Sequence, residues 1–365
     1  MPNFSSNSSN KPLIYDLDLV ELESILASWN EPGYRAAQIW RGLYQSLWDR
    51  PDDFTTLPLA LRERLADEFT FSHLRPVKAL DSSDGETRKT LFEIPSHSNS
   101  TIRKPSFSDK LAVEAVLMRY SKRRTLCIST QAGCAMGCVF CATGQMGFRR
   151  HLSSGEIVEQ VLYYARQLHA QGEEVTNVVV MGMGEPFHNY EATMAAIDRL
   201  NHPDGFNFGA RRFTVSTVGL IPMIRRFASE KRQVNLAVSL HAADDELRSS
   251  MLPVNHKYPL AQLIPACREY VETTHRRITF EWALIQGVND SLEQADRLAE
   301  LLSDMLCHVN IIPLNPTHRY AGQPTSRQQA VLFKEELERK SIPCTIRLRR
   351  GIDIQAGCGQ LAIEA

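Results

Sequence analysis

Three cysteines with the spacing Cys-x3-Cys-x2-Cys are the residues whose types and spacing most directly indicate chemistry in this sequence. They are Cys134, Cys138 and Cys141. Four-iron clusters are held by cysteine thiolates, and this triplet supplies one thiolate fewer than a closed cluster needs. An iron without a protein ligand is open to a substrate or cofactor, as is the open position of a catalytic zinc. The triplet therefore predicts a reactive iron–sulfur cluster.

Two other interpretations of the triplet stay open on the residues alone. A structural zinc site would need a fourth Cys or His, and His151, ten residues after Cys141, is the nearby candidate. Buried thiols without any ligand are the other alternative. Gly133 and Gly137 leave the backbone free to wrap a compact ion, and Phe140 could shield a cofactor from water. The spacing favours the cluster.

Cys358 is a second thiol with an unusual setting. It lies between Gly357 and Gly359, a flexible context that suits a mobile nucleophile better than a packed core. Cys127 lies seven residues before the first cysteine of the triplet, on a predicted strand. Two thiols near one site allow a transient disulfide, although a spectator role for Cys358 stays open. The other cysteines lack such settings and are interpreted as structural: Cys267, Cys307 and Cys344.

Alternating strand and helix patterns after about residue 100 indicate the elements that would position these thiols. This alternation predicts a parallel sheet with helical crossovers. The predicted strands are 126–129, 178–181, 213–216, 236–239, 278–284, 309–313 and a late strand at 344–349. The predicted helices include 155–171, 260–274 and 292–305.

Polar side chains and glycines follow several of these predicted strands. Barrel enzymes carry their chemistry on the loops after the strands, so these residues are expected to meet at one mouth. The glycine-rich turn 182–186 would let a ligand approach the backbone closely. Each residue alone also fits a structural role. The candidates able to hydrogen-bond a ligand are Glu185, Ser216, Ser239, His241 and Asn315.

The N-terminal part has a different pattern. Residues 15–75 show apolar residues at helical spacing, which predicts a small helical domain. The stretch 95–108 is rich in Ser, Asn and Pro and predicts a linker. We therefore expect two domains, 1–100 and 101–365. From the residues alone, the small domain could be a docking module without chemistry.

Length and composition fit an ordinary enzyme. The chain has 365 residues, of which 43% are hydrophobic, enough for one large α/β domain and a small one. No apolar run approaches the roughly 18 residues that span a bilayer. Residues 1–10 lack the pattern of a secretory signal, which predicts a cytoplasmic protein. Eight cysteines, three of them in one motif, fit a reducing compartment better than a disulfide framework.

Three segments of the sequence resemble those of a known family. The Cys-x3-Cys-x2-Cys motif is similar to the signature of the radical S-adenosylmethionine (SAM) superfamily, whose open iron chelates the methionine part of SAM. The run 125–148 (TLCISTQAGCAMGCVFCATGQMGF), the turn 181–186 (MGMGEP) and the end 350–361 (RGIDIQAGCGQL) together resemble the RlmN/Cfr family of RNA methyltransferases. The resemblance covers most of the chain. It implies an α/β fold, an incomplete (β/α)6 barrel with a small N-terminal helical domain.

The resemblance also implies cofactors and their ligands. One [4Fe-4S] cluster would be held by the cysteine triplet, and two SAM molecules would be used per turnover. The residues that match SAM-binding positions are Gly184, Glu185, Ser216, Ser239, Leu240, His241 and Asn315.

The implied reaction assigns catalytic roles to three residues. Adenine C2 has no lone pair with which to attack a sulfonium methyl, so a radical route is needed. Cys358 would accept a methyl group from one SAM, and a 5′-deoxyadenosyl radical from a second would abstract hydrogen from it. The carbon radical would add to adenine, Glu114 would take the ring proton, and Cys127 would attack Cys358, releasing the product and leaving a disulfide. On the residues alone, Glu114 also fits an outward-facing strand residue paired with an arginine.

The implied substrates are 23S rRNA and adenosine 37 of tRNA, methylated at adenine C2. The partners would include an external electron donor and a thiol reductant, with no membrane. Basic residues cluster at 119–124, 149–150, 211–212, 225–226 and 347–350, several beside the motifs, where an RNA backbone would pass. Each cluster alone fits a solvated face. The alternatives are C8 methylation of the kind Cfr performs, a non-methylating radical SAM enzyme, or a non-catalytic iron–sulfur factor that binds ribosomes.

Overall fold

A ten-stranded mixed sheet is the central feature of the structure, a computed structural model that describes residues 11–95, 111–347 and 349–362. The strand order is β1-β2-β3-β4-β7-β8-β9-β10-β11-β12. Neighbours from β1 to β4 pair antiparallel, and those from β4 to β12 pair parallel. The strands are β1 (Arg75–Asp81), β2 (Thr87–Ile94), β3 (Leu111–Arg119), β4 (Arg124–Cys127), β7 (Asn177–Val180), β8 (Phe213–Thr217), β9 (Asn235–Ser239), β10 (Ile278–Leu284), β11 (Cys307–Pro313) and β12 (Cys344–Ile346).

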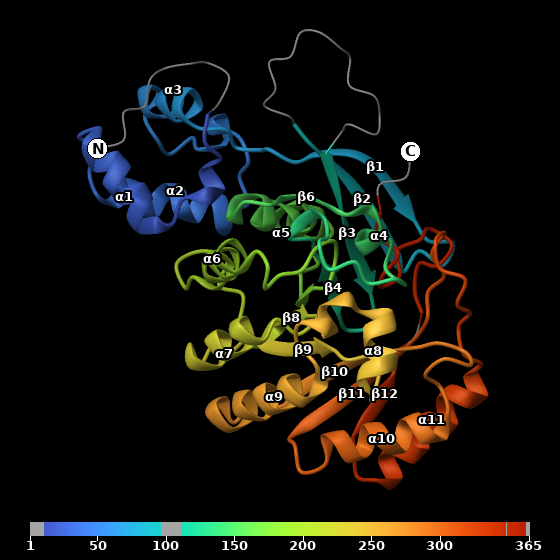
Figure 1. The fold of residues 1–365 in the computed structure, drawn as a ribbon. Coiled ribbons are helices and arrows are strands. Elements are labelled where there is room, and N and C mark those ends of the chain that lie inside the picture. The colour runs from blue at the N-terminus through green and yellow to red at the C-terminus, as the bar shows by residue number, and fades with distance from the viewer. Residues whose placement is uncertain (1–10, 96–110, 348, 363–365) are drawn as a thin grey trace, which may run out of the picture.

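Helices cover the outer face of this curved sheet (Figure 1). Along the chain, they lie in the connections between successive parallel strands, as crossovers require. The helices of this part are α4 (Ala142–Met146), α5 (Ser154–His169), α6 (Tyr190–Asn201), α7 (Ile221–Ser229), α8 (Asp245–Met251), α9 (Leu260–Thr274), α10 (Leu292–Leu302) and α11 (Arg327–Arg339), with short 3-10 turns at Ala210–Arg212 and Pro253–His256. Over the described residues, the edge strands β1 and β12 do not pair with each other. The predicted incomplete α/β barrel is therefore confirmed.

The parallel strands are the part of the fold that the sequence predicted best. Strand β10 and helix α9 have the predicted bounds, and β10 is buried at six of its seven positions and mostly apolar. The predicted late strand is shorter and ends at Ile346. Strands β1 and β2 were not predicted, and β3 was considered only as the strand around Glu114. A separate ribbon of β5 (Gln131–Gly133) and β6 (Phe148–His151) was not predicted either.

The N-terminal part contains the expected helices. They are α1 (Leu19–Ser28), α2 (Tyr34–Tyr44) and α3 (Leu59–Glu68), with short 3-10 turns at Ile14–Asp16 and Pro51–Asp53. Strands β1 and β2 follow them and belong to the large sheet. The expected linker 95–108 and the boundary near residue 100 lie almost entirely outside the described residues.

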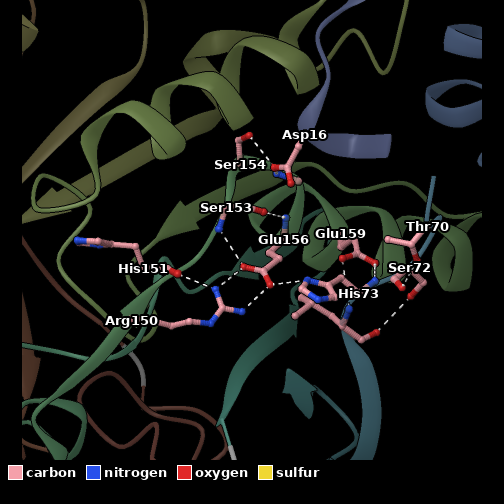
Figure 2. A network of polar contacts seen from close by, with 12 residues as sticks. Asp16, Thr70, Ser72, His73, Arg150, His151, Ser153, Ser154, Glu156 and Glu159 are labelled. Atoms are coloured by element: carbon pink, nitrogen blue, oxygen red, sulfur yellow. Dashed lines mark hydrogen bonds and ion pairs between the residues drawn. The ribbon is translucent and has the colours of Figure 1, made fainter. Parts of the chain in front are cut away.

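The first turn of α5 anchors the N-terminal part to the barrel (Figure 2). Asp16 Oδ1 accepts hydrogen bonds from the Gly155 amide at 2.7 Å and the Ser154 hydroxyl at 3.1 Å. A carboxylate is favourable at this end of a helix because the first amides of a helix have no partner within it. The backbone around Asp16 packs closely against Gly155, since a Cβ on Gly155 would lie 2.8 Å from the Asp16 nitrogen.

Two buried glutamates of α5 extend this anchor (Figure 2). Glu156, 1% exposed, contacts the His73 Nδ1 at 2.7 Å and the Arg150 Nη2 at 2.6 Å. Glu159 accepts hydrogen bonds from the amides of His73 at 2.8 Å and Leu74 at 3.3 Å. Burial alone would raise the pKa of Glu156, but the hydrogen bonds from His73 and Arg150 hold that pKa at about 2. The ionised carboxylate thus ties the segment before β1 to α5 and β6.

The helices are too short or too polar to span a membrane in the part of the chain that the structure describes, residues 11–95, 111–347 and 349–362.

Candidate active site

A cavity opens where the parallel strands end, and it brings together most of the predicted site. The three cysteines of the triplet line it. Six of the seven residues predicted to hold SAM line it as well: Gly184, Glu185, Ser216, Ser239, His241 and Asn315. The wall is completed by residues that include Phe140, Thr143, Gly144, Glu281, Cys358 and Gly359. Loops far apart in the sequence therefore converge at one mouth, as expected for chemistry on a barrel.

The loop that carries the triplet is braced by the β5–β6 ribbon. The Cys134 amide donates to the Gly147 carbonyl at 3.1 Å. Gly133 has a φ of +73°, and a Cβ there would lie 1.9 Å from the Gly147 oxygen, so only glycine fits. At the other end of the loop, the Ala142 amide donates to the Gly359 carbonyl at 2.7 Å. The cysteine loop is thus joined directly to the segment that carries Cys358.

The three thiols of the triplet line one cavity, as the ligands of a shared cluster would. Among residues 11–95, 111–347 and 349–362, no three His, Cys, Asp or Glu side chains are close enough to share one metal ion. A four-iron cluster is larger than one ion, and each thiolate binds a different iron, so its ligands lie further apart. Phe140 packs edge-on against His241 with ring centres 5.0 Å apart, which gives the cavity an aromatic wall beside the triplet.

Glu185 lies at the bottom of the cavity and is held by backbone amides. Its two carboxylate oxygens accept from Phe187 N at 3.0 Å and Val218 N at 2.9 Å. Its own amide donates to Gln131 Oε1 at 2.8 Å. Burial raises the pKa of Glu185 to about 7, against the opposing effect of these amides. A ligand ammonium group would favour the ionised form.

His241 presents a neutral ring to the cavity. Its Nδ1 accepts the Ala283 amide at 2.8 Å, so Nε2 carries the proton. Burial lowers the pKa of His241 to about 3. The neighbouring Leu240 is fully buried and does not line the cavity, while its amide donates to the Glu281 carbonyl at 3.1 Å. Leu240 would thus act on a ligand through its backbone or through packing.

Asn315 joins the cavity to the C-terminal segment. Its Nδ2 donates to the Cys358 carbonyl at 3.0 Å, and a Cβ on Gly357 would lie 2.6 Å from that nitrogen. The Asn315 Oδ1 is buried and has no hydrogen-bond partner among the described residues. A buried acceptor without a partner is costly, and a ligand donor would satisfy it.

Cys358 and Cys127 lie at a second, smaller cavity behind the first. Cys358 lines both cavities, and Cys127 lines the smaller one together with Met181 and Arg347. Burial raises the pKa of Cys127 to about 12 and that of Cys358 to about 11, while Arg347 lowers both. Cys358 remains exposed to the open cavity. Its surroundings therefore disfavour the thiolate while leaving the sulfur accessible to a ligand.

Glu114 faces the barrel interior from β3. It is 4% exposed, and its Oε1 lies 2.9 Å from the Lys89 Nζ. Its Oε2 accepts the amide of Ala362 at 3.0 Å. The carboxylate is therefore next to the segment of Cys358, and it is inward-facing.

Three further residues of the site had no spacing signal in the sequence. Lys89 contacts Glu114 from β2, Arg347 lies at the two-thiol cavity, and Glu281 lines the main cavity while accepting from Asn310 at 2.9 Å. Glu281 lies in an apolar strand, where a buried carboxylate is unusual and could have been noticed.

Comparison with known proteins agrees with this geometry. Residues 128–301 match the family described as the radical SAM superfamily, and residues 13–70 match the ribosomal RNA large subunit methyltransferase N-terminal domain. A crystal structure of a radical SAM methyltransferase from Sphaerobacter thermophilus matches with a TM-score of 0.91 and 50% identity, covering 97% of this chain and 100% of that one. The barrel and its cysteine loop thus define a radical SAM enzyme.

Relatives that align over nearly the whole chain show to which family of radical SAM enzymes it belongs. A probable dual-specificity RNA methyltransferase RlmN from Chloroflexus aurantiacus is 49% identical, over 96% of this chain and 92% of the relative. The dual-specificity RNA methyltransferase RlmN 1 of Myxococcus xanthus is 46% identical, over 98% and 95%. The chain belongs to the RlmN family of radical SAM RNA methyltransferases.

Proposed function

We propose that this protein methylates C2 of adenosine in 23S rRNA and adenosine 37 of tRNA, using Cys358 as the carrier of the methyl carbon. One observation carries the proposal: Cys358 lines both the cavity of the cysteine triplet and the smaller cavity of Cys127. A thiol in that position can receive a carbon on one side and be attacked by a second thiol on the other. RlmN relatives are named as dual-specificity RNA methyltransferases, which supports RNA as the substrate.

The triplet of cysteines would hold the [4Fe-4S] cluster, and the six cavity residues would hold SAM, with Leu240 packed behind them. When bound, the cluster and SAM would supply the one-electron chemistry that activates the methyl carbon. They would also accept an electron when the adenine ring regains its aromaticity. Glu185 would bind the ammonium of SAM, and the unpartnered Asn315 Oδ1 would accept a further donor. Phe140 and the buried walls would exclude water from the reacting atoms.

The chain's own residues would carry the remaining steps. The Cys358 thiolate would attack the methyl carbon of SAM, the bond from that carbon to the sulfonium sulfur would break, and S-adenosylhomocysteine would leave. After that carbon has joined the adenine ring, Glu114 accepts the ring proton. The Cys127 sulfur then attacks the Cys358 sulfur, the bond from Cys358 to carbon breaks, and the carbon takes a proton. The resulting disulfide needs a thiol reductant, and the activation needs an electron donor, so a reducing compartment such as the cytoplasm fits the proposal.

Product mapping tests the proposal. The protein is reconstituted anaerobically with iron and sulfide, reduced, and incubated with SAM and with unmodified rRNA or tRNA. We expect 2-methyladenosine in digested RNA by mass spectrometry, together with 5′-deoxyadenosine. An 8-methyladenosine product would assign the Cfr-type reaction instead. Formation of 5′-deoxyadenosine without any methylated RNA would overturn RNA methylation itself.

A further inference from the structure

Lys89 is a buried lysine whose surroundings require an explanation. Its side chain is 9% exposed, and its ammonium lies 2.9 Å from the Glu114 carboxylate, which is 6% exposed. Burying an ion pair costs desolvation energy that the attraction between the charges often does not recover. Two hydrophobic side chains on the adjacent strands β2 and β3 would fill the same space without this desolvation cost. The charges at this place therefore indicate a role other than stability.

The register of the sheet places this pair beside a reactive thiol. Lys89 is opposite Val116 in the β2–β3 pair, and Val116 is opposite Cys127 in the β3–β4 pair. Residues opposite each other in a sheet point to the same face, and so do residues two apart on one strand. Lys89, Glu114 and Cys127 therefore all face the barrel interior.

The ion pair also holds the segment of Cys358 at two points. The Lys89 ammonium donates to the Gln355 carbonyl at 3.2 Å, three residues before Cys358. The Glu114 carboxylate accepts the Ala362 amide at 3.0 Å, four residues after Cys358. One salt bridge thus holds both ends of the segment 355–362, which we call the thiol segment.

We propose that Lys89 is a positioning residue that fixes Glu114 and the thiol segment in one arrangement, so that proton removal and release of Cys358 are linked. This inference rests on the function proposed above. Glu114 must be ionised to accept the ring proton, and a neighbouring ammonium stabilises a buried carboxylate in that form. In this step the C–H bond of the ring carbon breaks, its electron pair stays with the ring, and the proton bonds to a Glu114 oxygen.

Protonation of Glu114 then changes the hold on the thiol segment. A neutral carboxyl attracts the Lys89 ammonium and the Ala362 amide less strongly than a carboxylate does. The Ala362 end of the thiol segment is loosened at that moment, while the Lys89 ammonium keeps its contact with the Gln355 carbonyl. This is the stage at which Cys358 must meet Cys127, so the proton transfer would free the segment when its movement is needed.

Three variants test this inference: Lys89→Met, Lys89→Arg and, as a matched control, Lys78→Met on the exposed strand β1. The first measurement uses the metal-free protein, without SAM or RNA. Hydrogen exchange of amides in the thiol segment should be at least about tenfold faster in Lys89→Met, because local opening becomes easier. Lys89→Arg should stay close to the unmodified protein, and Lys78→Met should match it.

The second measurement uses the reconstituted enzyme. Loss of a supporting contact to a catalytic group typically costs about 10- to 100-fold, so kcat for RNA methylation should fall by that factor in Lys89→Met. The acidic limb of its rate profile should move to higher pH, because the carboxylate has lost the Lys89 ammonium as a partner. Covalent RNA–protein adduct should also accumulate, since removal of the ring proton, which precedes release, is slowed. Lys89→Arg should restore the pH profile.

The outcomes separate this inference from the proposed function. If the unmodified enzyme gives no methylated RNA, the proposed function fails, while hydrogen exchange still reports the anchoring. If it methylates RNA and Lys89→Met keeps its rate, pH profile and exchange, the positioning role is wrong. A uniform fall in thermal stability without a shifted pH profile would also overturn it. Should Lys89→Met fail to fold, Lys89→Gln gives the same comparison.

Discussion

Two clusters of buried charges in this protein differ in how completely they are satisfied. At the anchor on α5, Glu156 has both His73 and Arg150 as partners, and its pKa is held at about 2. In the cavity, Glu185 is held by the amides of Phe187 and Val218 and by the Thr217 side chain, all neutral donors, and burial raises its pKa to about 7. Glu156 therefore has charged partners within the chain, whereas Glu159 of the same anchor is held by backbone amides and has a pKa raised by burial to about 7, like Glu185. The cavity holds groups whose environment would improve when a ligand arrives.

A raised pKa alone therefore does not mark a functional carboxylate, because Glu159 of the anchor shares it with Glu185, and what distinguishes Glu185 is its place in the wall of the cavity. Unpaired buried charges and acceptors are costly, so a fold retains them where another molecule compensates that cost. Asn315 Oδ1 is such an acceptor in the cavity. Substitutions at the anchor are therefore expected to change the stability of the fold, and substitutions at the cavity are expected to change the reaction.

The largest effect should come from Cys358→Ala. Because this sulfur would carry the methyl carbon, RNA methylation should fall by at least about 1,000-fold, measured by mass spectrometry of digested RNA. Thermal stability should change little, since Cys358 is exposed to the cavity. The control is Cys344→Ala, a buried thiol on β12, which should lower stability and keep activity. Methylation at the normal rate in Cys358→Ala would refute the thiol carrier.

Glu156→Gln should show the opposite pattern. It removes the charge that His73 and Arg150 share, so the free energy of unfolding should fall by about 2–4 kcal/mol in chemical denaturation. Glu173→Gln is the control, because Glu173 pairs with Arg119 and Arg124 at the surface and should cost at most about 1 kcal/mol. Equal losses in both variants would show that the anchor is no stronger than a surface pair.

Asn315→Ala should weaken SAM binding more than it weakens the fold. Loss of one buried hydrogen bond to a ligand is worth about 1–2 kcal/mol, or roughly 5- to 30-fold in the dissociation constant. Equilibrium dialysis with reconstituted protein measures this. Asn201→Ala on α6, whose side chain donates to the Phe208 carbonyl at 2.8 Å, should leave binding unchanged. Unaltered affinity in Asn315→Ala would mean that its oxygen does not contact SAM.

The smallest effect should be a pH dependence of the anchor. The hydrogen bond to Glu156 raises the pKa of His73 in the folded protein. The stability that this bond contributes is fully present below the ordinary pKa of histidine and is lost as pH rises through the pKa of His73 in the folded state. Burial raises the pKa of Glu159 to about 7, so its ionisation on going from pH 4.5 to 7 also disfavours the folded state. Stability should therefore fall from about pH 5.5 to 8.

Thermal denaturation across this range measures the trend. In Glu159→Gln, the fall in stability between pH 5 and 7 should be smaller, because the titrating carboxyl is removed. A stability that rises over the same range would contradict the assignment of these groups. Below pH 4.5 the trend should reverse, since protonation of Glu156 then removes the ion pairs of the anchor.

The sequence was most informative where the chemistry depends on residues close together in the chain. Apolar runs predicted the parallel strands, because strands buried on both faces must be apolar throughout. The antiparallel pairing of β2 with β3 was not predicted, and neither was the position of Glu114 relative to its neighbours. The bounds of the N-terminal domain remain a prediction, because the expected boundary lies outside the described residues.

By itself, the sequence determined the cysteine triplet, the glycines around Cys358 and the alternation of parallel strands and helices in the second part of the chain. These features are local, since spacing and backbone freedom act over a few residues. Only the tertiary structure decided that Lys89 meets Glu114, that Cys358 lies between two cavities, and that Glu156 is shared by His73 and Arg150. Strand register and helix packing create those contacts between distant residues, and no local pattern encodes them.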